Sequence, residues 1–426
     1  MKTIRIIVIS VVVSVVSVLG VLFAVVTYEQ FEHEKKVDKY LIEFQRQLDA
    51  EIKLAQEKEE SEISKKIEFK ILFGGDFSFG ENFQDILKEK GEESTLEKNG
   101  YEYSLTNFKQ ILLSSDYVVL NLETVLTDLS TSELEGEKPY ILYSDPKNTT
   151  YYLKKYNVDA VSLANNHAFD FGKDGLYQTI EVLEKNELDW FGAGRNGSEA
   201  YFPLFKTFKL GNEKFNLAVF GTFEFHKRFD QVYDFYANEI QAGVNMLDMY
   251  RLVSQIQHIK TLDPEIFVVV YPHWGHGYSW KTDKQTEIAH KLIDSGADLI
   301  LGHGSHKIQE VEYYNGKWIV YSLGNFMFNS PGLSYDYDFP QHSVIAVFSI
   351  TENNKEFSTN LKLYPIFSNN EMTNYQPRFL LEDEFDLTTK KLFEGNSIQN
   401  DELMTIGQDD IGHYVELSIF NSGPKK

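Results

Sequence analysis

Residues 160–167 read AVSLANNH: an apolar run from Ala160 to Leu163 leads directly into the polar residues Asn165, Asn166 and His167. The same change from an apolar run to polar residues recurs five more times along the chain. These runs end in Gly75-Asp76, Asn121-Leu122-Glu123, His273-Trp274-Gly275-His276, His303-Gly304-Ser305-His306 and Ser322-Leu323-Gly324-Asn325. Short apolar runs separated by amphipathic stretches are typical of buried, mostly parallel strands that helices cover on both faces. The sequence therefore predicts an α/β fold whose polar side chains gather at the carboxyl ends of the strands, where such sheets bind ligands.

The expected elements follow from the same pattern. Strands are predicted at 69–73, 117–122, 160–163, 216–220, 266–271, 299–301 and 318–321, and helices at 175–186, 248–260 and 284–295. Two later stretches, 343–350 and 360–366, are expected to complete a second sheet. This places the globular domain at 67–366, and the acidic, loop-like residues 367–426 are assigned to a C-terminal extension.

The N-terminus predicts a membrane anchor. Residues 6–28 carry no charge and consist mostly of Val, Ile and Leu, and they are long enough to cross a hydrocarbon core of about 30 Å. A cleavable signal peptide is the alternative, but its apolar region is ~7–15 residues long, and Val25-Val26-Thr27 is a poor cleavage site. Residues 1–28 are therefore interpreted as a short N-terminal tip and an uncleaved transmembrane helix.

Residues 29–66 predict a helical stalk. No Gly or Pro occurs between Gly20 and Gly74, and apolar residues recur at steps of three and four. They are Val37, Leu41, Phe44, Leu48, Ile52 and Ala55. Two interpretations remain open: a coiled coil that forms a homodimer, or a single helix that lies on its own domain or on a partner.

Composition excludes several classes of function. The formal charge of −23 argues against binding to nucleic acid, whose phosphates require a basic surface. An anionic substrate would need a metal ion or a local group of cations to offset this charge. The chain has no cysteine, which excludes thiolate metal sites, disulfides and cysteine nucleophiles.

The polar residues at the strand ends predict a metal site. Five of the eleven histidines fall in three of these loops, and Asp, Glu and Asn occupy the others. This mixture of ligands suits zinc, manganese or iron. One or two ions are expected, and two ions about 3.5–4 Å apart would activate a water for displacement at phosphorus.

The six motifs, followed in one case by Asp170-Phe171-Gly172, occur in the order found in the CapA/PgsA family of bacterial capsule synthesis proteins, which this chain resembles over roughly 69–328. That family is similar in fold to the calcineurin-like metallophosphoesterases. The resemblance therefore implies a four-layer sandwich of two facing sheets flanked by helices. It also implies that the tip of residues 1–28 is cytoplasmic and that the large C-terminal part lies outside the cell.

The resemblance also implies roles for individual residues. The metal ligands would be Asp76, Glu123 near the bridging position, Asn166, His273, and His303 or His306. His167 would be the general acid or the group that stabilises the transition state. The site would be lined by Asn121, Asn165, Trp274, His276 and Asn325.

The chain departs from the phosphoesterase motifs at two points and from many capsule relatives at a third. Ser78 stands where the first motif has a histidine, two residues rather than one separate His303 from His306, and His276-Gly277 replaces the acids that many capsule relatives carry. A site with a single metal ion, or a vestigial site, is therefore also consistent with the sequence.

Three functions remain. The first is an accessory subunit that, with other capsule-synthesis subunits, elongates, exports or attaches an anionic polymer such as poly-γ-glutamate at the membrane. The second is a metal-dependent hydrolase of phosphoesters or of the polymer's amide bonds. The third is a binding module on an inactive enzyme scaffold, since a fold does not determine a function.

Overall fold

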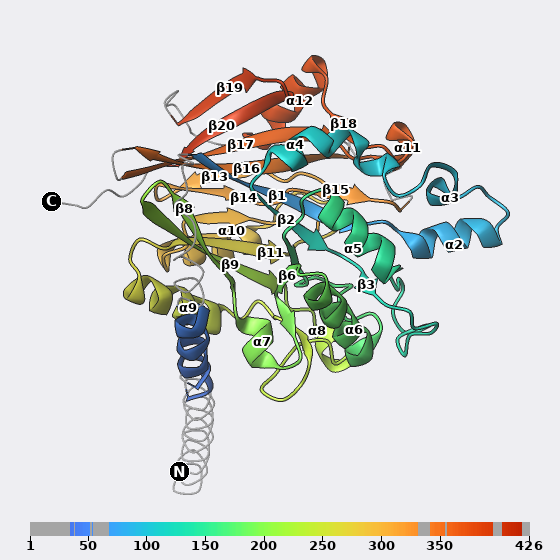
Figure 1. The fold of residues 1–426 in the computed structure, drawn as a ribbon, viewed down its shortest axis with the longest axis horizontal. Coiled ribbons are helices and arrows are strands. Elements are labelled where there is room, and N and C mark those ends of the chain that lie inside the picture. Colours follow the sequence, from blue (N-terminus) through green and yellow to red (C-terminus); the bar gives the residue numbers. More distant parts are fainter. Residues whose placement is uncertain are drawn as a thin grey trace, which may run out of the picture. The chain divides into compact units, whose positions relative to one another are not determined.

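The computed structural model describes residues 35–37, 39–51, 53, 68–330, 341–353, 356–394 and 403–419 (Figure 1). They belong to two units, 1–50 and 51–426, which we describe separately. In the first unit, residues 35–37 and 39–50 are helical, as the stalk pattern predicts. No helix among the described residues is both long enough and apolar enough to cross a membrane. The anchor predicted at 6–28 lies outside the described residues.

The larger sheet of the second unit has ten strands with β1 at its centre. β1 (Glu68–Ser78), β2 (Tyr117–Leu122), β5 (Ala160–Ser162) and β6 (Asp189–Phe191) run parallel on one side. β16 (His342–Asn353), β17 (Glu356–Phe367), β20 (His413–Ile419) and β19 (Met404–Gln408) continue the sheet antiparallel on the other. β15 (Asn325–Phe328) pairs in parallel with β1, and β18 (Arg378–Phe379) pairs with β17.

The second sheet has six strands. β9 (Glu213–Phe223), β11 (Phe267–His273), β12 (Leu299–Leu301) and β14 (Lys317–Val320) are parallel neighbours. The edge strands β8 (Leu204–Leu210) and β13 (Val311–Tyr314) are antiparallel to them. Two small two-stranded pairings, β3 (Val125–Leu126) with β4 (Tyr143–Ser144) and β7 (Ala193–Gly194) with β10 (Gly243–Val244), lie outside both sheets.

The two sheets pack face to face. Successive strand side chains point to opposite faces of a sheet, so alternate residues of each strand enter one core. Ile71 and Phe73 of β1 share a buried cluster with Val269 and Tyr271 of β11. Leu72 of the same β1 instead packs into a second cluster with residues of several helices. The larger sheet is therefore covered by the second sheet on one face and by helices on the other.

Helices form the two outer layers. α4 (Lys109–Ser114), α5 (Pro146–Lys155) and α6 (Gly172–Lys185) cover the larger sheet. α9 (Met249–Leu262) and α10 (Asp283–Asp294) connect successive parallel strands of the second sheet, and right-handed crossovers place both on its outer face. The order helix, sheet, sheet, helix gives the four layers that the resemblance implied. The shorter helices are α2 (Glu81–Glu89), α3 (Thr95–Asn99), the 3-10 helix η1 (Tyr103–Phe108), α7 (Gly197–Tyr201), α8 (Lys227–Gln231), α11 (Asn370–Thr373) and α12 (Glu382–Leu392).

Two expectations about the later strands are wrong. The stretches at 343–350 and 360–366 do not complete the second sheet, because β16 pairs with β1 and so joins the larger one. Residues beyond 367 are not simply loop-like, because β20 pairs with β17. Val415, Leu417 and Ile419 alternate with polar residues and are buried, but the acids around them obscure this period in the sequence.

Candidate metal centre

The predicted site residues come from the ends of strands in both sheets, not from one sheet. Asp76 lies near the end of β1, and Glu123 follows β2. His273 ends β11, and His303 and His306 follow β12. A parallel bridge between His273 and His303 continues the pairing of β11 with β12. The ligands therefore meet where the carboxyl ends of both sheets open onto the same space.

Asp76 is fully buried and lies at the centre of this group. Its Oδ1 is 3.2 Å from Nδ1 of His303 and 3.7 Å from Nδ1 of His273. Its Oδ2 is 3.4 Å from Nδ1 of His306 and accepts a hydrogen bond of 3.1 Å from the backbone N–H of Gly304. The carboxylate thus contacts three histidines of the opposite sheet.

These residues form two overlapping groups with the spacing of metal ligands. Asp76, His273 and His303 form one group, and Asp76, Glu123 and His306 form the other; within each group the ligand atoms lie within 4.8 Å of one another. Asp76 is the carboxylate that the two groups share, and Glu123, which we expected near the bridging position, belongs to the second group. Both His303 and His306 belong to the centre, one in each group.

The bonding of the buried polar atoms fits a metal ion. Among the described residues, neither carboxylate oxygen of Glu123 has a hydrogen-bond partner, and the same holds for Nε2 of His303 and Oδ1 of Asn166. Leaving such groups buried and unpaired costs about 1–3 kcal/mol each, and more for a charged group. A divalent cation would satisfy oxygen and imidazole donors of this kind.

The charges of the centre shift its pKa values in opposite directions. Burial raises the pKa of Glu123 well above its usual range, and the charge of Asp76 raises it further. For Asp76 the effect of burial is outweighed by hydrogen bonds from His303 and His306, which hold its pKa well below the usual range. Burial lowers the pKa of His306, but Glu123 and Asp76 raise it by more, so that the pKa is about 9. Carboxylates concentrated in one buried space favour a cation there.

His167 is held beside the centre by a buried ion pair. Its Nδ1 lies 2.7 Å from Oδ2 of Asp170 and 3.1 Å from Nζ of Lys138. Lys138 also lies 2.7 Å from Oδ1 of Asp170, and both side chains are almost fully buried. Nε2 of His167 faces Glu123 at 3.9 Å. Burial, followed by the charge of Lys138, lowers the pKa of His167 to about 4.

Three asparagines support the ligands. Asn121 donates a 2.9 Å hydrogen bond to Oδ1 of Asp76. Asn165 donates to Oδ1 of Asn121 and to the carbonyl of Leu122, and its own Oδ1 accepts from the backbone N–H of His167.

Asn325 completes this support from the larger sheet. It starts β15, pairs with Asp76 in the strand register, and its Oδ1 lies 2.9 Å from Nδ1 of His306.

Other predicted residues have different positions. Trp274 is buried and donates from its indole N–H to the carbonyl of Tyr321, so it supports the loop instead of lining the site. His276 is exposed and belongs to neither ligand group. Ser78 accepts a hydrogen bond from the backbone N–H of Gly80 and so stabilises a turn. Asn166 is half-buried with the unpartnered oxygen noted above.

Sequence reasoning gave no role to two residues beside the centre. Asp170 follows His167 by three positions, and that spacing was the signal for their contact. Lys138 carries no comparable signal, because it lies in a polar stretch far from the strand ends. Only the fold brings its ammonium group beneath His167.

Glycines allow the loops of the centre to approach closely. A Cβ on Gly75 would lie 1.7 Å from the carbonyl oxygen of Gly324. At Gly304, where φ is +100°, a Cβ would lie within 2.8 Å of the ring of His273. Side chains at these positions would push apart the loops that carry the ligands.

Comparison with known families identifies the same region. The family model described as bacterial capsule synthesis protein PGA_cap matches residues 70–330, which include every candidate ligand.

Curated relatives give a consistent result. The PGA biosynthesis protein CapA of Bacillus subtilis is 31% identical over 258 residues, which cover 60% of this chain and 62% of that protein. The capsule biosynthesis protein CapA of Bacillus anthracis is 31% identical over 252 residues, 58% of each chain. A probable polyglutamine synthesis accessory protein of Mycobacterium tuberculosis is 24% identical over 328 residues, 70% of this chain and 84% of that one. The match therefore spans about three fifths of the two Bacillus proteins.

A solved phosphatase from Mycoplasma pneumoniae aligns with 72% of this chain and 96% of its own. The TM-score is 0.38 at 13% identity, which is too low to establish a shared fold.

Proposed function

Because the chain belongs to the bacterial capsule synthesis protein family, we propose that it is a membrane-anchored accessory subunit for the synthesis or export of capsular poly-γ-glutamate or a similar anionic polymer. The observation that carries this proposal is the convergence of Asp76, Glu123, His273, His303 and His306 within the matched region 70–330. The anchor at 6–28 would hold this domain at the outer face of the membrane. Other capsule-synthesis subunits would be its partners, and the stalk would allow a homodimer.

The centre would hold one or two divalent ions of manganese, zinc or iron. Asp76, Glu123 and the three histidines would ligate them, with Asn166 as a further oxygen donor. A bound metal of this kind supplies a Lewis acid for a carboxylate, amide or phosphate oxygen and lowers the pKa of a bound water. On a chain with a net charge of −23, such ions would also offset the repulsion of a polyanionic substrate.

His167 would hold or move a proton at Nε2. If Nδ1–H donates to Asp170, Nε2 is left without its proton and faces the centre at 3.9 Å from Glu123. Lys138 fixes the position of Asp170, so the ring keeps this orientation. A pKa of about 4 keeps the imidazole neutral at pH 7, as a proton acceptor requires.

This arrangement also supports a second candidate function, a cell-surface phosphoesterase or polymer hydrolase. A histidine oriented by a carboxylate next to a metal-ligand group is a common arrangement for acid–base catalysis. Turnover of p-nitrophenyl phosphate by the purified protein with added manganese, abolished by His167→Ala, would favour the hydrolase over the accessory subunit.

Capsule complementation tests the accessory function. In a strain that lacks this chain, we expect the unchanged protein to restore surface polymer and His273→Ala to fail. His276→Ala is the matched control, because that histidine is exposed and outside the ligand groups. Restoration of the capsule by His273→Ala at normal protein levels would contradict a role for the metal centre.

A further inference from the structure

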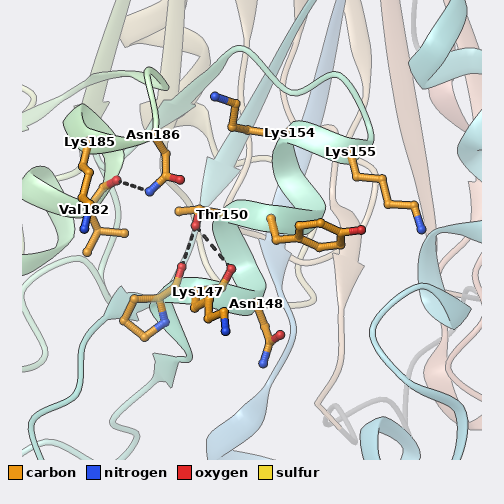
Figure 2. A pocket seen from close by; sticks show the side chains of 10 residues that line it. Lys147, Asn148, Thr150, Lys154, Lys155, Val182, Lys185 and Asn186 are labelled. Carbon is orange, nitrogen blue, oxygen red and sulfur yellow. Dashed lines mark hydrogen bonds between the residues drawn. The ribbon is translucent and has the colours of Figure 1, made fainter.

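A second candidate site lies on the outer helical layer. α5 and α6 border a surface groove of about 1020 Å³ (Figure 2). Its lining residues come from both helices: Pro146, Lys147, Asn148, Thr150, Tyr151, Lys154, Lys155, Val182, Lys185 and Asn186. Neither the metal centre nor the proposed accessory function accounts for this groove.

The groove is basic on a strongly acidic protein. Four of its ten lining residues are lysines, all exposed, and none is an acid. Lys147 and Lys185 form no ion pair with any described residue. Lys154 lies 3.7 Å from a largely exposed Glu187, and Lys155 lies 2.8 Å from Glu102. Exposed pairs of this kind contribute about 0–1 kcal/mol, so an incoming anion can compete for these lysines.

The lysines are spread along the groove instead of converging on one point. Lys147 is in the first turn of α5 and Lys155 is its last residue. Eight residues of α-helix rise about 12 Å, so these two charges cannot hold one small anion together. Figure 2 shows Lys147 at one end of α5 and Lys154 and Lys155 toward the other. Separated cations on flexible stems suit an extended polyanion better than a single phosphate group.

Part of the groove's lining is apolar and suits the methylene groups of a polymer chain. Val182, Pro146 and the ring of Tyr151 provide carbon surface. Two polar groups of the lining are already bonded: the hydroxyl of Thr150 donates to the carbonyl of Pro146, and the amide of Asn186 donates to the carbonyl of Val182. Exposed lysines beside this carbon surface match a polymer whose carboxylates are separated by methylene groups.

We propose that this groove binds a segment of a polycarboxylate chain and acts as a docking site separate from the metal centre. This inference rests on the proposed function for the class of polymer. The groove is lined by the last residues of α6, whereas the first turn of that helix follows Asp170 at the centre. Fourteen helical residues rise about 20 Å, so the groove would hold the polymer at some distance from the centre.

The test measures binding of sodium poly-γ-glutamate to the full-length protein in mild detergent. We expect Lys147→Glu/Lys185→Glu to weaken binding about tenfold or more, because each reversal replaces an attraction with a repulsion. Lys147→Gln/Lys185→Gln should weaken it less, and salt should weaken binding to the unchanged protein. The matched control is Lys109→Glu/Lys390→Glu, which reverses two exposed lysines outside the groove.

Each outcome decides the proposal. Loss of polymer binding in the groove variant but not in the control supports it. Equal weakening of binding in both variants would mean that only net charge matters. Unchanged binding in the groove variant would mean that the polymer binds elsewhere. Either result would overturn the proposal. Loss of binding to phosphatidylglycerol vesicles without loss of polymer binding would assign the lysines to a membrane surface, and the proposal would again fail.

Capsule complementation separates this proposal from the proposed function. If the groove variant binds polymer normally while His273→Ala still abolishes the capsule, the groove is wrong and the accessory function stands. If the unchanged protein binds no polymer, the proposed docking site is likewise wrong. Restoration of the capsule by His273→Ala would, separately, contradict an accessory role for the metal centre.

Discussion

Oδ1 of Asp76 lies 3.2 Å from Nδ1 of His303, and this contact joins the central strand of the ten-stranded sheet to the loop that follows β12 of the six-stranded sheet. Both side chains are completely buried. The candidate metal centre therefore depends on the packing of the two sheets against each other, and changes to that packing should be felt at the site.

Gly75 tests how tightly the backbone next to Asp76 is packed. A Cβ there would overlap the carbonyl oxygen of Gly324, and no flexible side chain can move to relieve the overlap. We expect Gly75→Ala to destabilise the protein by about 3 kcal/mol or more, or to prevent folding. Gly277→Ala is the control, because its Cβ would make only an ordinary contact at 3.8 Å. Urea denaturation of both variants measures the difference, and equal stabilities would show that the loops adjust freely.

Lys138 should be important for stability as well as for the site. Lys138→Met would leave the buried carboxylate of Asp170 without its cation, which costs about 3–5 kcal/mol. The double variant Lys138→Met/Asp170→Asn should recover part of this loss in a double-mutant cycle. The surface pair Lys155–Glu102 provides a comparison, since Lys155→Met should cost no more than about 1 kcal/mol. Similar costs for the two lysine variants would argue against a buried ion pair.

Glu81 predicts a pH dependence of stability that is separate from the metal centre. Burial raises its pKa to about 7, although Tyr101 and the backbone N–H of Asp145 donate hydrogen bonds to it. Between the unfolded pKa near 4.5 and the folded value near 7, the folded state binds more protons than the unfolded state. The contribution of Glu81 to stability is therefore fully present below pH 4.5, and this contribution is lost as the pH rises through 7.

The variant Glu81→Gln isolates this effect. Relative to the unchanged protein, it should gain up to about 3 kcal/mol of unfolding free energy between pH 5 and pH 8. The exposed Glu89→Gln should show no such gain. Parallel stability curves for Glu81→Gln and the unchanged protein across this range would contradict the raised pKa.

The predicted anchor is tested by location. With residues 6–28 as an uncleaved span, the protein should remain in the membrane fraction at its full mass. Protease added outside intact cells should remove the globular part. A soluble product that lacks roughly the first thirty residues, the length of a signal peptide, would support the alternative of a cleavable signal peptide.

The sequence predicted the layers of the fold better than the assignment of strands to sheets. The parallel strands were visible as apolar runs, because burial on both faces removes polar residues from them. The pairing of β16 with β1 was not visible in the sequence. A buried strand of either sheet carries the same kinds of apolar side chain, so the pattern does not show which sheet the strand joins. β20 was missed because Tyr414, Glu416 and Ser418 flank Val415 and Leu417, which leaves only a short apolar alternation.

For the candidate site, the sequence indicated the residues at the strand ends but not how they are arranged in space. Its strand-end residues carry a local signal, the passage from an apolar run to Asp, Glu, Asn or His. Their distribution over two sheets, and the sharing of Asp76 between two ligand groups, depend on tertiary packing. Lys138 was missed for the same reason, because its role comes only from its contact with Asp170.

Metal content measures the central claim most directly. Protein purified without chelator should contain about one or two divalent ions per chain by mass spectrometry, as two overlapping ligand groups imply. Asp76→Ala should remove the metal almost completely, because both groups share this carboxylate, and His273→Ala should lower its stoichiometry. The exposed Asp230→Ala should leave it unchanged. Stoichiometric metal in folded Asp76→Ala, or none in the unchanged protein after incubation with manganese, zinc or iron, would contradict the metal centre.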